Sequence, residues 1–228
     1  MLAIIAPENK YVSNLLDEFN YEKKESKNNL NVYKINYDNH QFLIVTTGYG
    51  KVNIASNMMY VYQKYKIKLF VLIGTAGSIN ENCNIFDVVI PKYTLQYDVD
   101  FMPLGLEAAQ LPGLNTWFYE TNDDINNCIL DVCKDKNYYT DLVVSSDMYV
   151  CNYRLSQSIK HEYDACCVDV ECGSVGEFCY TNNIPYSCIK VVSNYANNNG
   201  LKQYNMYDER ASKICQNITS AFIKKFYE

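Results

Sequence analysis

Arginine is scarce in this sequence, and negative charge outweighs positive charge. Arg154 and Arg210 are the only arginines, and the 228 residues carry a net charge of −6. Because surfaces that bind nucleic acid or anionic membranes are rich in basic residues, we expect neither partner. A highly phosphorylated substrate is disfavoured for the same reason.

Histidine, paired cysteines and a secretion signal are also lacking. His40 and His161, the only histidines, have no partners at ligand spacing, and the ten cysteines form no CxxC pair, so we predict no metal site and no cofactor. The apolar stretch Leu2 to Pro7 is too short for a signal peptide or a membrane span. We therefore expect a cytoplasmic protein with free thiols, in which Cys166 and Cys167 point to opposite faces of a strand.

Alternating short and long apolar patterns indicate the fold class. Of the residues, 48% are apolar and 20% charged, and no linker interrupts the chain, which favours one domain over residues 1–228. The alternation predicts an α/β fold with a mostly parallel sheet covered by helices. Strands are predicted at Leu2–Ala6, Asn31–Tyr37, Gln41–Thr46, Leu69–Ile73, Asp87–Gln96, Asp141–Ser145, Cys166–Val170 and Tyr186–Val192. Helices are predicted at Pro7–Phe19, Val52–Lys66, Asp123–Lys136, Arg154–Glu162, Cys172–Thr181 and Met206–Phe226.

Glycine-rich segments follow two of the predicted strands. Gly74 to Ser78 comes directly after one and predicts a tight turn, where a ligand could reach backbone N–H groups; the same turn could equally be a plain connection. Gly48 to Val52 is a second glycine turn that opens a helix. Neither contains GxxxxGK[ST] or GxGxxG, so these phosphate-binding loops are excluded. Tyr97–Tyr119 lacks periodicity and predicts a long functional or interfacial loop.

Two further apolar runs end in polar residues. Cys166 to Val170 is followed by Glu171, and Ile184 to Val192 is followed by Ser193 and Asn194. Because open α/β sheets bind ligands at the carboxyl ends of their strands, these residues predict a functional site.

Ordered motifs along nearly the whole chain resemble one family. They are Gly48–Val52, Gly74–Ser78, Phe86–Val89, Asp98–Asp100, Gln110–Gly113, Ser145–Val150, Val168–Glu171 and Ser193–Asn194. In this order they resemble the bacterial methylthioadenosine/S-adenosylhomocysteine nucleosidases of the purine nucleoside phosphorylase superfamily. The resemblance implies a single-domain phosphorylase-like α/β fold with a central twisted mixed sheet, a homodimer, and hydrolysis of the N-glycosidic bond of a purine nucleoside.

The resemblance also implies roles for individual residues. Glu171 would hold the ribose hydroxyls, with Val170 packed against the sugar, although an acid at a helix start can also be merely structural. Tyr149 would stack on the purine, unless it is a plain core aromatic, and the Val150 backbone would contact the base edge. Further expected substrate-binding residues are Thr75, Ala76, Gly77 and Ser193, Tyr207 over the 5′ end, and Leu104 and Pro112 lent across the dimer interface.

Two positions depart from the family pattern. Asn194 occupies the place of the proton-donating aspartate, and an amide can hydrogen-bond to a purine but cannot deliver a proton to it. Tyr11 occupies the place of the glutamate that activates water. Glu8 lies three residues earlier on the same helical face and is a candidate replacement.

Three hypotheses therefore stay open at this point. The first is a nucleosidase acting on methylthioadenosine, S-adenosylhomocysteine or a relative. The second is a hydrolase of 6-oxopurine nucleosides such as inosine or futalosine, because Asn194 can donate to N7 or O6. The third is a homologue that binds or stores nucleosides without cleaving them. Phosphorolysis is disfavoured because Leu72 stands where the related phosphorylases carry a phosphate-binding arginine.

Overall fold

The computed structural model describes residues 1–228, the side chain of Lys23 excepted. The strands are β1 Leu2–Ala6, β2 Tyr21–Lys27, β3 Leu30–Tyr37, β4 His40–Thr46, β5 Leu69–Ser78, β6 Val88–Val89, β7 Tyr93–Gln96, β8 Tyr119–Glu120, β9 Tyr138–Tyr139, β10 Val143–Ser145, β11 Cys167–Asp169 and β12 Tyr186–Tyr195. The α-helices are α1 Ser13–Phe19, α2 Lys51–Tyr65, α3 Asp123–Asp131, α4 Tyr153–Tyr163, α5 Cys172–Thr181 and α6 Gly200–Tyr227, with 3-10 helices η1 Asn9–Tyr11 and η2 Met102–Leu104. In the described part of the chain, no helix combines the length and apolarity needed to cross a membrane.

The strands form one mixed sheet around β5. The order is β2-β3-β4-β1-β5-β11-β10-β7-β8, and β12 pairs with β5 and β6. Along its first half β5 lies parallel to both β1 and β12, and near its end it pairs antiparallel with β11. The expected α/β fold with a central mixed sheet is thus confirmed. Strands β11 and β12 both pair with the last residues of β5.

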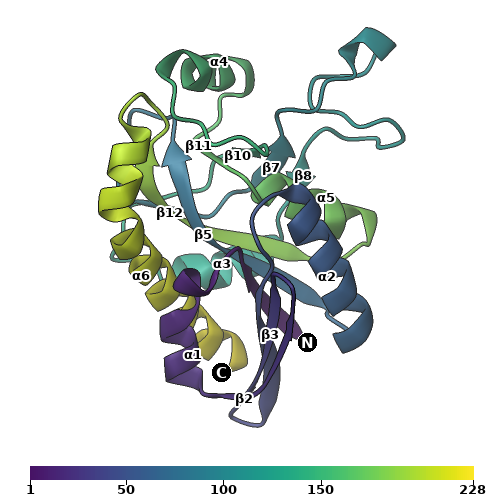
Figure 1. Ribbon diagram of the computed structural model, residues 1–228, viewed down its shortest axis with the longest axis vertical. Helices are drawn as coiled ribbons and strands as arrows, with labels where there is room; N and C mark the ends of the chain where they lie inside the picture. The colour runs from purple at the N-terminus through teal and green to yellow at the C-terminus, as the bar shows by residue number, and fades with distance from the viewer.

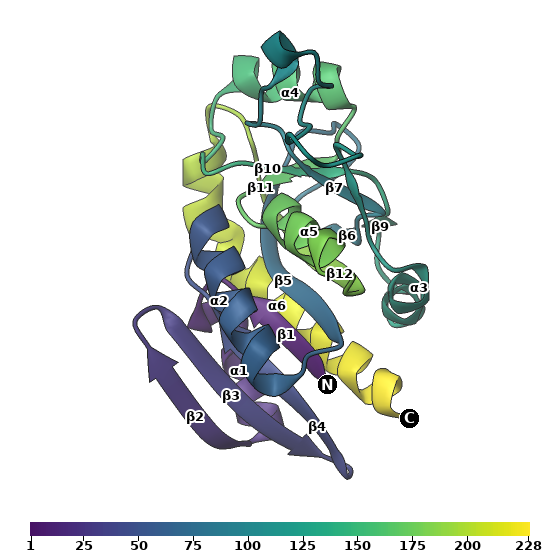
Figure 2. The same cartoon turned by 90° about the vertical axis from the view of Figure 1, so that its right-hand side faces the viewer.

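Helices cover both faces of the sheet. The long helix α6 packs against β5 and β12 together with α1 and α3, whereas α2 and α5 lie together on the opposite face (Figures 1 and 2). Each face has its own apolar core: Phe70 and Leu72 of β5 point toward α2 and α5, and Val71 and Ile73 point toward α6. This alternation along β5 is the period of two that a strand buried on both faces requires.

The sequence-based boundaries were right for β1 and α5 and wrong in three instructive places. The polar strand β2 was missed because Tyr21–Lys27 is an edge strand with exposed charges rather than an apolar run. The strand expected over Asp87–Gln96 is divided into β6 and β7, with Pro91 between them. The turn expected at Gly74–Ser78 is instead the second half of β5, since β11 and β12 satisfy its backbone hydrogen bonds from both sides.

Two predicted helices also differ from those in the structure. The helix expected over Pro7–Phe19 is divided into η1 and α1, and the helix expected from Met206 begins six residues earlier, at Gly200. The segment between β7 and β8, which contains η2, protrudes from the body of the molecule (Figure 1), as a long interfacial loop would.

Candidate active site

A cavity of about 600 Å³ lies where β5, β11 and β12 meet. Gly77 of β5 pairs with Val168 of β11 on one side and with Asn194 of β12 on the other. A Cβ at position 77 would lie 3.1 Å from the Asn194 amide nitrogen, so a larger residue here would push the Asn194 side chain from its position. The other walls come from η1, the start of α2, the segment before α4 and the first turns of α6.

Most of the expected site residues line this one cavity. They are Glu8, Tyr11, Thr75, Gly77, Tyr149, Val150, Val170, Glu171, Ser193 and Asn194. Ala76 lies buried behind the cavity wall, and its carbonyl oxygen is 3.5 Å from the Ser193 hydroxyl oxygen. The structure therefore brings together residues from five separate stretches of the chain.

Three expected residues lie outside the cavity. Leu104, which is 74% exposed, and Pro112 are on the protruding segment. The expected position of Tyr207 over the cavity needs correction, because its ring packs on Phe86 at a centroid distance of 5.6 Å. Since α6 starts at Gly200, the residues that face the cavity from this helix are Leu201 and Tyr204, and Tyr204 lies about one turn before Tyr207.

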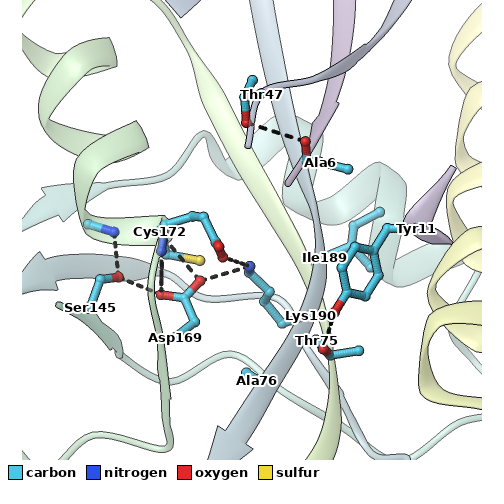
Figure 3. Close-up of polar contacts among 12 residues, drawn as sticks. Ala6, Tyr11, Thr47, Thr75, Ala76, Ser145, Asp169, Cys172, Ile189 and Lys190 are labelled. Carbon is cyan, nitrogen blue, oxygen red and sulfur yellow. Dashed lines mark hydrogen bonds and ion pairs between the residues drawn. The ribbon is translucent and has the colours of Figure 1, made fainter. Parts of the chain in front are cut away.

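A buried ion cluster forms the floor of the cavity. Lys190 Nζ lies 2.8 Å from Asp169 Oδ2 (Figure 3) and 3.1 Å from Glu171 Oε2. All three side chains are buried. Asp169 is fully engaged, because it also accepts hydrogen bonds from the Ser145 hydroxyl and from the Cys172 N–H at the start of α5. By contrast Glu171 Oε1 has no partner, the one such buried side-chain atom among those the structure describes.

Burial and charge set the protonation of this cluster. Burial raises the pKa of Glu171 to about 7, against the opposing pull of Lys190. Burial also opposes the charge on Lys190, but the carboxylates of Asp169 and Glu171 outweigh it and hold the Lys190 pKa well above its usual range. The cavity thus contains a carboxyl group that changes charge near neutral pH and has one free acceptor oxygen.

The amide of Asn194 is held in place by its neighbours. Its Oδ1 accepts a hydrogen bond from the Ser193 hydroxyl at 2.9 Å, and its Nδ2 donates to the Tyr195 carbonyl at 3.2 Å. An amide nitrogen carries two hydrogens, so one Nδ2 hydrogen is left for a ligand. This end of the cavity can donate a hydrogen bond to a ligand acceptor.

Aromatic side chains form the opposite wall. The rings of Tyr149 and Tyr204 meet edge to face with centroids 5.8 Å apart, and Tyr149 is 47% exposed. A core aromatic would be covered, so the exposure of Tyr149 favours the stacking interpretation. Met148 and Leu201 extend this apolar wall. A flat ring inserted here would find an apolar face on one side and the Asn194 amide at its edge.

Polar side chains from three elements meet at the third side of the cavity. The Tyr11 hydroxyl of η1 lies 3.1 Å from Thr75 Oγ1 of β5, and both hydrogen-bond to the carboxylate of Asp208 on α6 (Figure 3 shows the first contact). Lys10 Nζ lies 2.8 Å from Asp208 Oδ2. Glu8 stays at the rim, where it accepts from the Tyr49 hydroxyl at 3.0 Å.

Comparison with known proteins identifies the family. A family model described as the phosphorylase superfamily matches residues 2–227. A 5′-methylthioadenosine/S-adenosylhomocysteine nucleosidase of Buchnera aphidicola subsp. Acyrthosiphon pisum is 31% identical over 191 residues, which cover 79% of this chain and 78% of that protein. The chain belongs to this nucleosidase family of the phosphorylase superfamily.

Two further proteins are similar over nearly the whole chain, at lower identity. An aminodeoxyfutalosine nucleosidase of Campylobacter jejuni is 24% identical over 227 residues and covers 98% of each chain. A Helicobacter pylori 5′-methylthioadenosine/S-adenosylhomocysteine nucleosidase, solved as an Asp→Asn variant with 5′-methylthioadenosine in its active site, superposes with a TM-score of 0.93 at 17% identity and 98% coverage of both chains. At that identity the superposition shows a shared fold.

Sequence reasoning missed several residues that line the cavity or lie directly behind its wall. Lys190 interrupts the apolar run of β12, and a lone lysine in a buried strand is a signal that could have revealed the ion cluster. Tyr204 and Asp208 lie on one face of α6. They were missed because the helix was predicted to start at Met206, after Tyr204, so that this face was not recognised. No sequence signal connects Asp208 with Tyr11, 197 positions apart.

The arrangement of the cysteines also corrects an expectation. Cys166 Sγ lies 3.8 Å from Cys167 Sγ rather than across the sheet, because β11 begins only at Cys167. Their sulfurs and that of Cys83 lie within 4.8 Å of one another, outside the cavity described above.

Removing the Lys190 charge should destabilise the protein. In Lys190→Met, the buried carboxylates of Asp169 and Glu171 lose their counter-charge, and we expect the free energy of unfolding to fall by about 3–5 kcal/mol. The control Lys213→Met removes an exposed ion pair with Glu209 on α6. It should change the free energy of unfolding by less than about 0.5 kcal/mol. Urea denaturation of both variants measures the difference. A Lys190→Met protein as stable as the control would contradict the assigned ion cluster.

Activity should depend on pH through Glu171. The family resemblance implies that Glu171 contacts the sugar, where its ionised carboxylate would favour positive charge. Because the Glu171 pKa is raised to about 7, this ionised form is lost progressively as the pH falls below about 7. We therefore expect kcat/KM, which reports groups of the free protein, to rise with pH through about 7 and then level off. Steady-state rates from pH 5.5 to 8.5 test this, and a profile flat below 7 would contradict it.

Proposed function

We propose that the protein hydrolyses the N-glycosidic bond of purine nucleosides, with 5′-methylthioadenosine, S-adenosylhomocysteine or a close relative as substrate. The observation that carries the proposal is the free Oε1 of buried Glu171, an acceptor that a ribose hydroxyl would satisfy. The Buchnera relative carries the nucleosidase name, which supports the same activity here.

The cavity offers a position for each part of such a nucleoside. The purine would stack on Tyr149 with its imidazole edge toward Asn194, and the ribose would lie over Glu171. Cleavage breaks the bond between the purine nitrogen and C1′, and the electron pair leaves with the purine. The sugar then carries positive charge, which the Glu171 carboxylate stabilises more strongly than the neutral ground state. Water bonds to C1′ and gives up a proton, and the departing purine takes up a proton, which completes the hydrolysis.

The Asn194 amide favours a second candidate substrate class, the 6-oxopurine nucleosides. Its free Nδ2 hydrogen can donate to O6 or N7 of hypoxanthine, whereas the amide cannot protonate adenine at N7. The Campylobacter relative named as an aminodeoxyfutalosine nucleosidase supports nucleosides with a larger 5′ group as further candidates.

Water rather than phosphate is the proposed acceptor of the sugar. Among the described residues that line the cavity, Lys10 is the single lysine or arginine, and it is paired with Asp208. Leu72, at the position where related phosphorylases carry arginine, is buried in β5. A phosphate dianion would therefore meet no free basic group.

We also propose that the chain is one phosphorylase-like domain that works as a cytoplasmic homodimer. The protruding segment between β7 and β8 exposes Leu104 and Trp117, which are 74% and 37% accessible. A partner subunit packing on this segment would cover them and would bring Leu104 and Pro112 to the open side of its neighbour's cavity.

Release of free base tests the proposed function. The full-length protein is incubated with 5′-methylthioadenosine, S-adenosylhomocysteine, inosine and futalosine, and adenine and hypoxanthine are separated by chromatography. We expect base release from at least one nucleoside. If folded protein releases no base from any of the four, the proposal is wrong; hypoxanthine release alone would select the second substrate class.

A further inference from the structure

We propose that Asp208 accepts the proton of the attacking water, through the hydroxyl of Tyr11. This inference rests on the proposed hydrolysis. Asp208 lies on the third turn of α6 and is only 6% exposed. Its Oδ1 accepts hydrogen bonds from the Tyr11 hydroxyl at 3.1 Å and from Thr75 Oγ1 at 2.7 Å. Both donors line the cavity, so the carboxylate lies directly behind the cavity wall.

Tyr11 alone cannot serve as the base. Burial raises its pKa, with the Asp208 charge acting in the same direction, so the phenol stays neutral throughout the physiological pH range. A neutral phenol that donates to a carboxylate can still pass a proton on, because its oxygen accepts one hydrogen while its own hydrogen moves to the carboxylate. The Tyr11 hydroxyl is therefore a link between the cavity and Asp208.

The step balances without any further reactant. The water oxygen forms a bond to C1′ as the bond from C1′ to the purine nitrogen breaks, and the electron pair of that bond leaves with the purine. One water proton moves to the Tyr11 oxygen, and the Tyr11 hydroxyl proton moves to Asp208 Oδ1. The purine leaves as an anion and takes up a proton from solvent, and Asp208 returns its proton to solvent. Thr75, 3.1 Å from the Tyr11 oxygen, positions the water at the start of this path.

Glu8, the acid expected from the sequence to supply this carboxylate, is placed differently. Its side chain is 49% exposed at the rim, and its carboxylate is engaged by the Tyr49 hydroxyl at 3.0 Å and by Lys10 at 3.6 Å. The side chains of Tyr11 and Thr75 hydrogen-bond to Asp208 and not to Glu8. Asp208 on α6, rather than Glu8 in the N-terminal segment, is therefore the carboxylate that accepts the proton.

Conservative variants separate this role from a structural one. Asp208→Asn keeps the shape and an acceptor oxygen but is a poor proton acceptor, so we expect kcat to fall by about 10²–10⁴-fold with KM nearly unchanged. Tyr11→Phe should fall similarly, because it interrupts the proton path. The matched control Glu209→Gln changes the next residue, which is exposed and paired with Lys213, and should keep the wild-type rate.

A double variant provides the decisive readout. Adding Tyr11→Glu to Asp208→Asn places a carboxylate beside Thr75 again, and we expect at least about tenfold recovery of kcat. Base release is measured with the nucleoside that the wild type cleaves fastest, alongside thermal melting of each variant. If the wild type is active and the Asp208→Asn variant keeps its kcat, the role of Asp208 is wrong but the proposed hydrolysis stands. The role of Asp208 is also wrong if the Asp208→Asn variant loses activity because it melts at a lower temperature and adding Tyr11→Glu does not restore kcat. An inactive wild type overturns the proposed function and this assignment together.

Discussion

Asn194→Asp should raise kcat for adenine release from 5′-methylthioadenosine by about 10²–10⁴-fold, the usual contribution of a general acid. An aspartate at this buried position would have a raised pKa and could protonate the departing purine at N7, which the amide cannot do. The Ser193 hydroxyl already donates to Oδ1 at 2.9 Å and would hold the new carboxyl group in the same orientation. Steady-state kinetics with chromatographic detection of adenine measure the change.

The matched control is Asn205→Asp, which makes the same substitution on the exposed side of α6 and should leave the rate unchanged. Hypoxanthine release from inosine should respond in the opposite sense, because the amide donor to O6 is lost. If Asn194→Asp leaves adenine release at the wild-type rate, the assigned position of the purine edge is incorrect.

Glu171→Gln should lower kcat by about 10²–10³-fold whichever purine the protein accepts, as expected for loss of one preorganised electrostatic group. The amide can still hydrogen-bond to a ribose hydroxyl, so KM should change little, but it carries no charge to stabilise the sugar cation. The variant should also lose the rise of kcat/KM through about pH 7, since the group that titrates there is gone.

Glu162→Gln, an exposed acid of α4, is the control for this experiment and should keep both the rate and the pH profile. A Glu171→Gln protein that retains its kcat, or that keeps the wild-type pH profile, would remove Glu171 from the reaction and leave it a structural partner of Lys190.

The fold could be predicted because its strands are short apolar runs between amphipathic helices. The boundaries that failed depend on contacts distant in sequence. Gly74 to Ser78 reads as a turn, but β11 and β12 supply hydrogen bonds on both sides and extend β5 through it. In the same way, Gly200 starts α6 although the helical periodicity is evident only from Met206.

The site residues also fall into those that could be predicted from the sequence and those that depend on contacts distant in sequence. Glu171 and Asn194 follow apolar runs and lie within motifs that resemble the family, so their place in the site could be predicted from the sequence. Asp208 could not, because an acid on a polar helix resembles a solvated residue until the structure shows it buried against Tyr11 and Thr75. The departure at Tyr11 was visible in the sequence, but its compensation lies 197 positions away.

Asp208 also bears on the hypothesis of a protein that only binds or stores nucleosides. The buried Asp208 carboxylate is paired with Lys10 at 2.8 Å and accepts hydrogen bonds from the two hydroxyls that face the cavity, so the cavity has the proton acceptor that hydrolysis needs and that storage does not. Together with the unpaired Glu171 oxygen, this arrangement favours turnover over storage.

The central claim, that this cavity cleaves a purine nucleoside with water, is tested most directly by following the oxygen atom. The protein is incubated with 5′-methylthioadenosine in phosphate buffer prepared with ¹⁸O-labelled water, and the sugar product is examined by mass spectrometry before exchange of its anomeric oxygen. We predict free methylthioribose that carries one ¹⁸O atom, formed together with adenine. A sugar 1-phosphate, or intact substrate after prolonged incubation with folded protein, would contradict the claim.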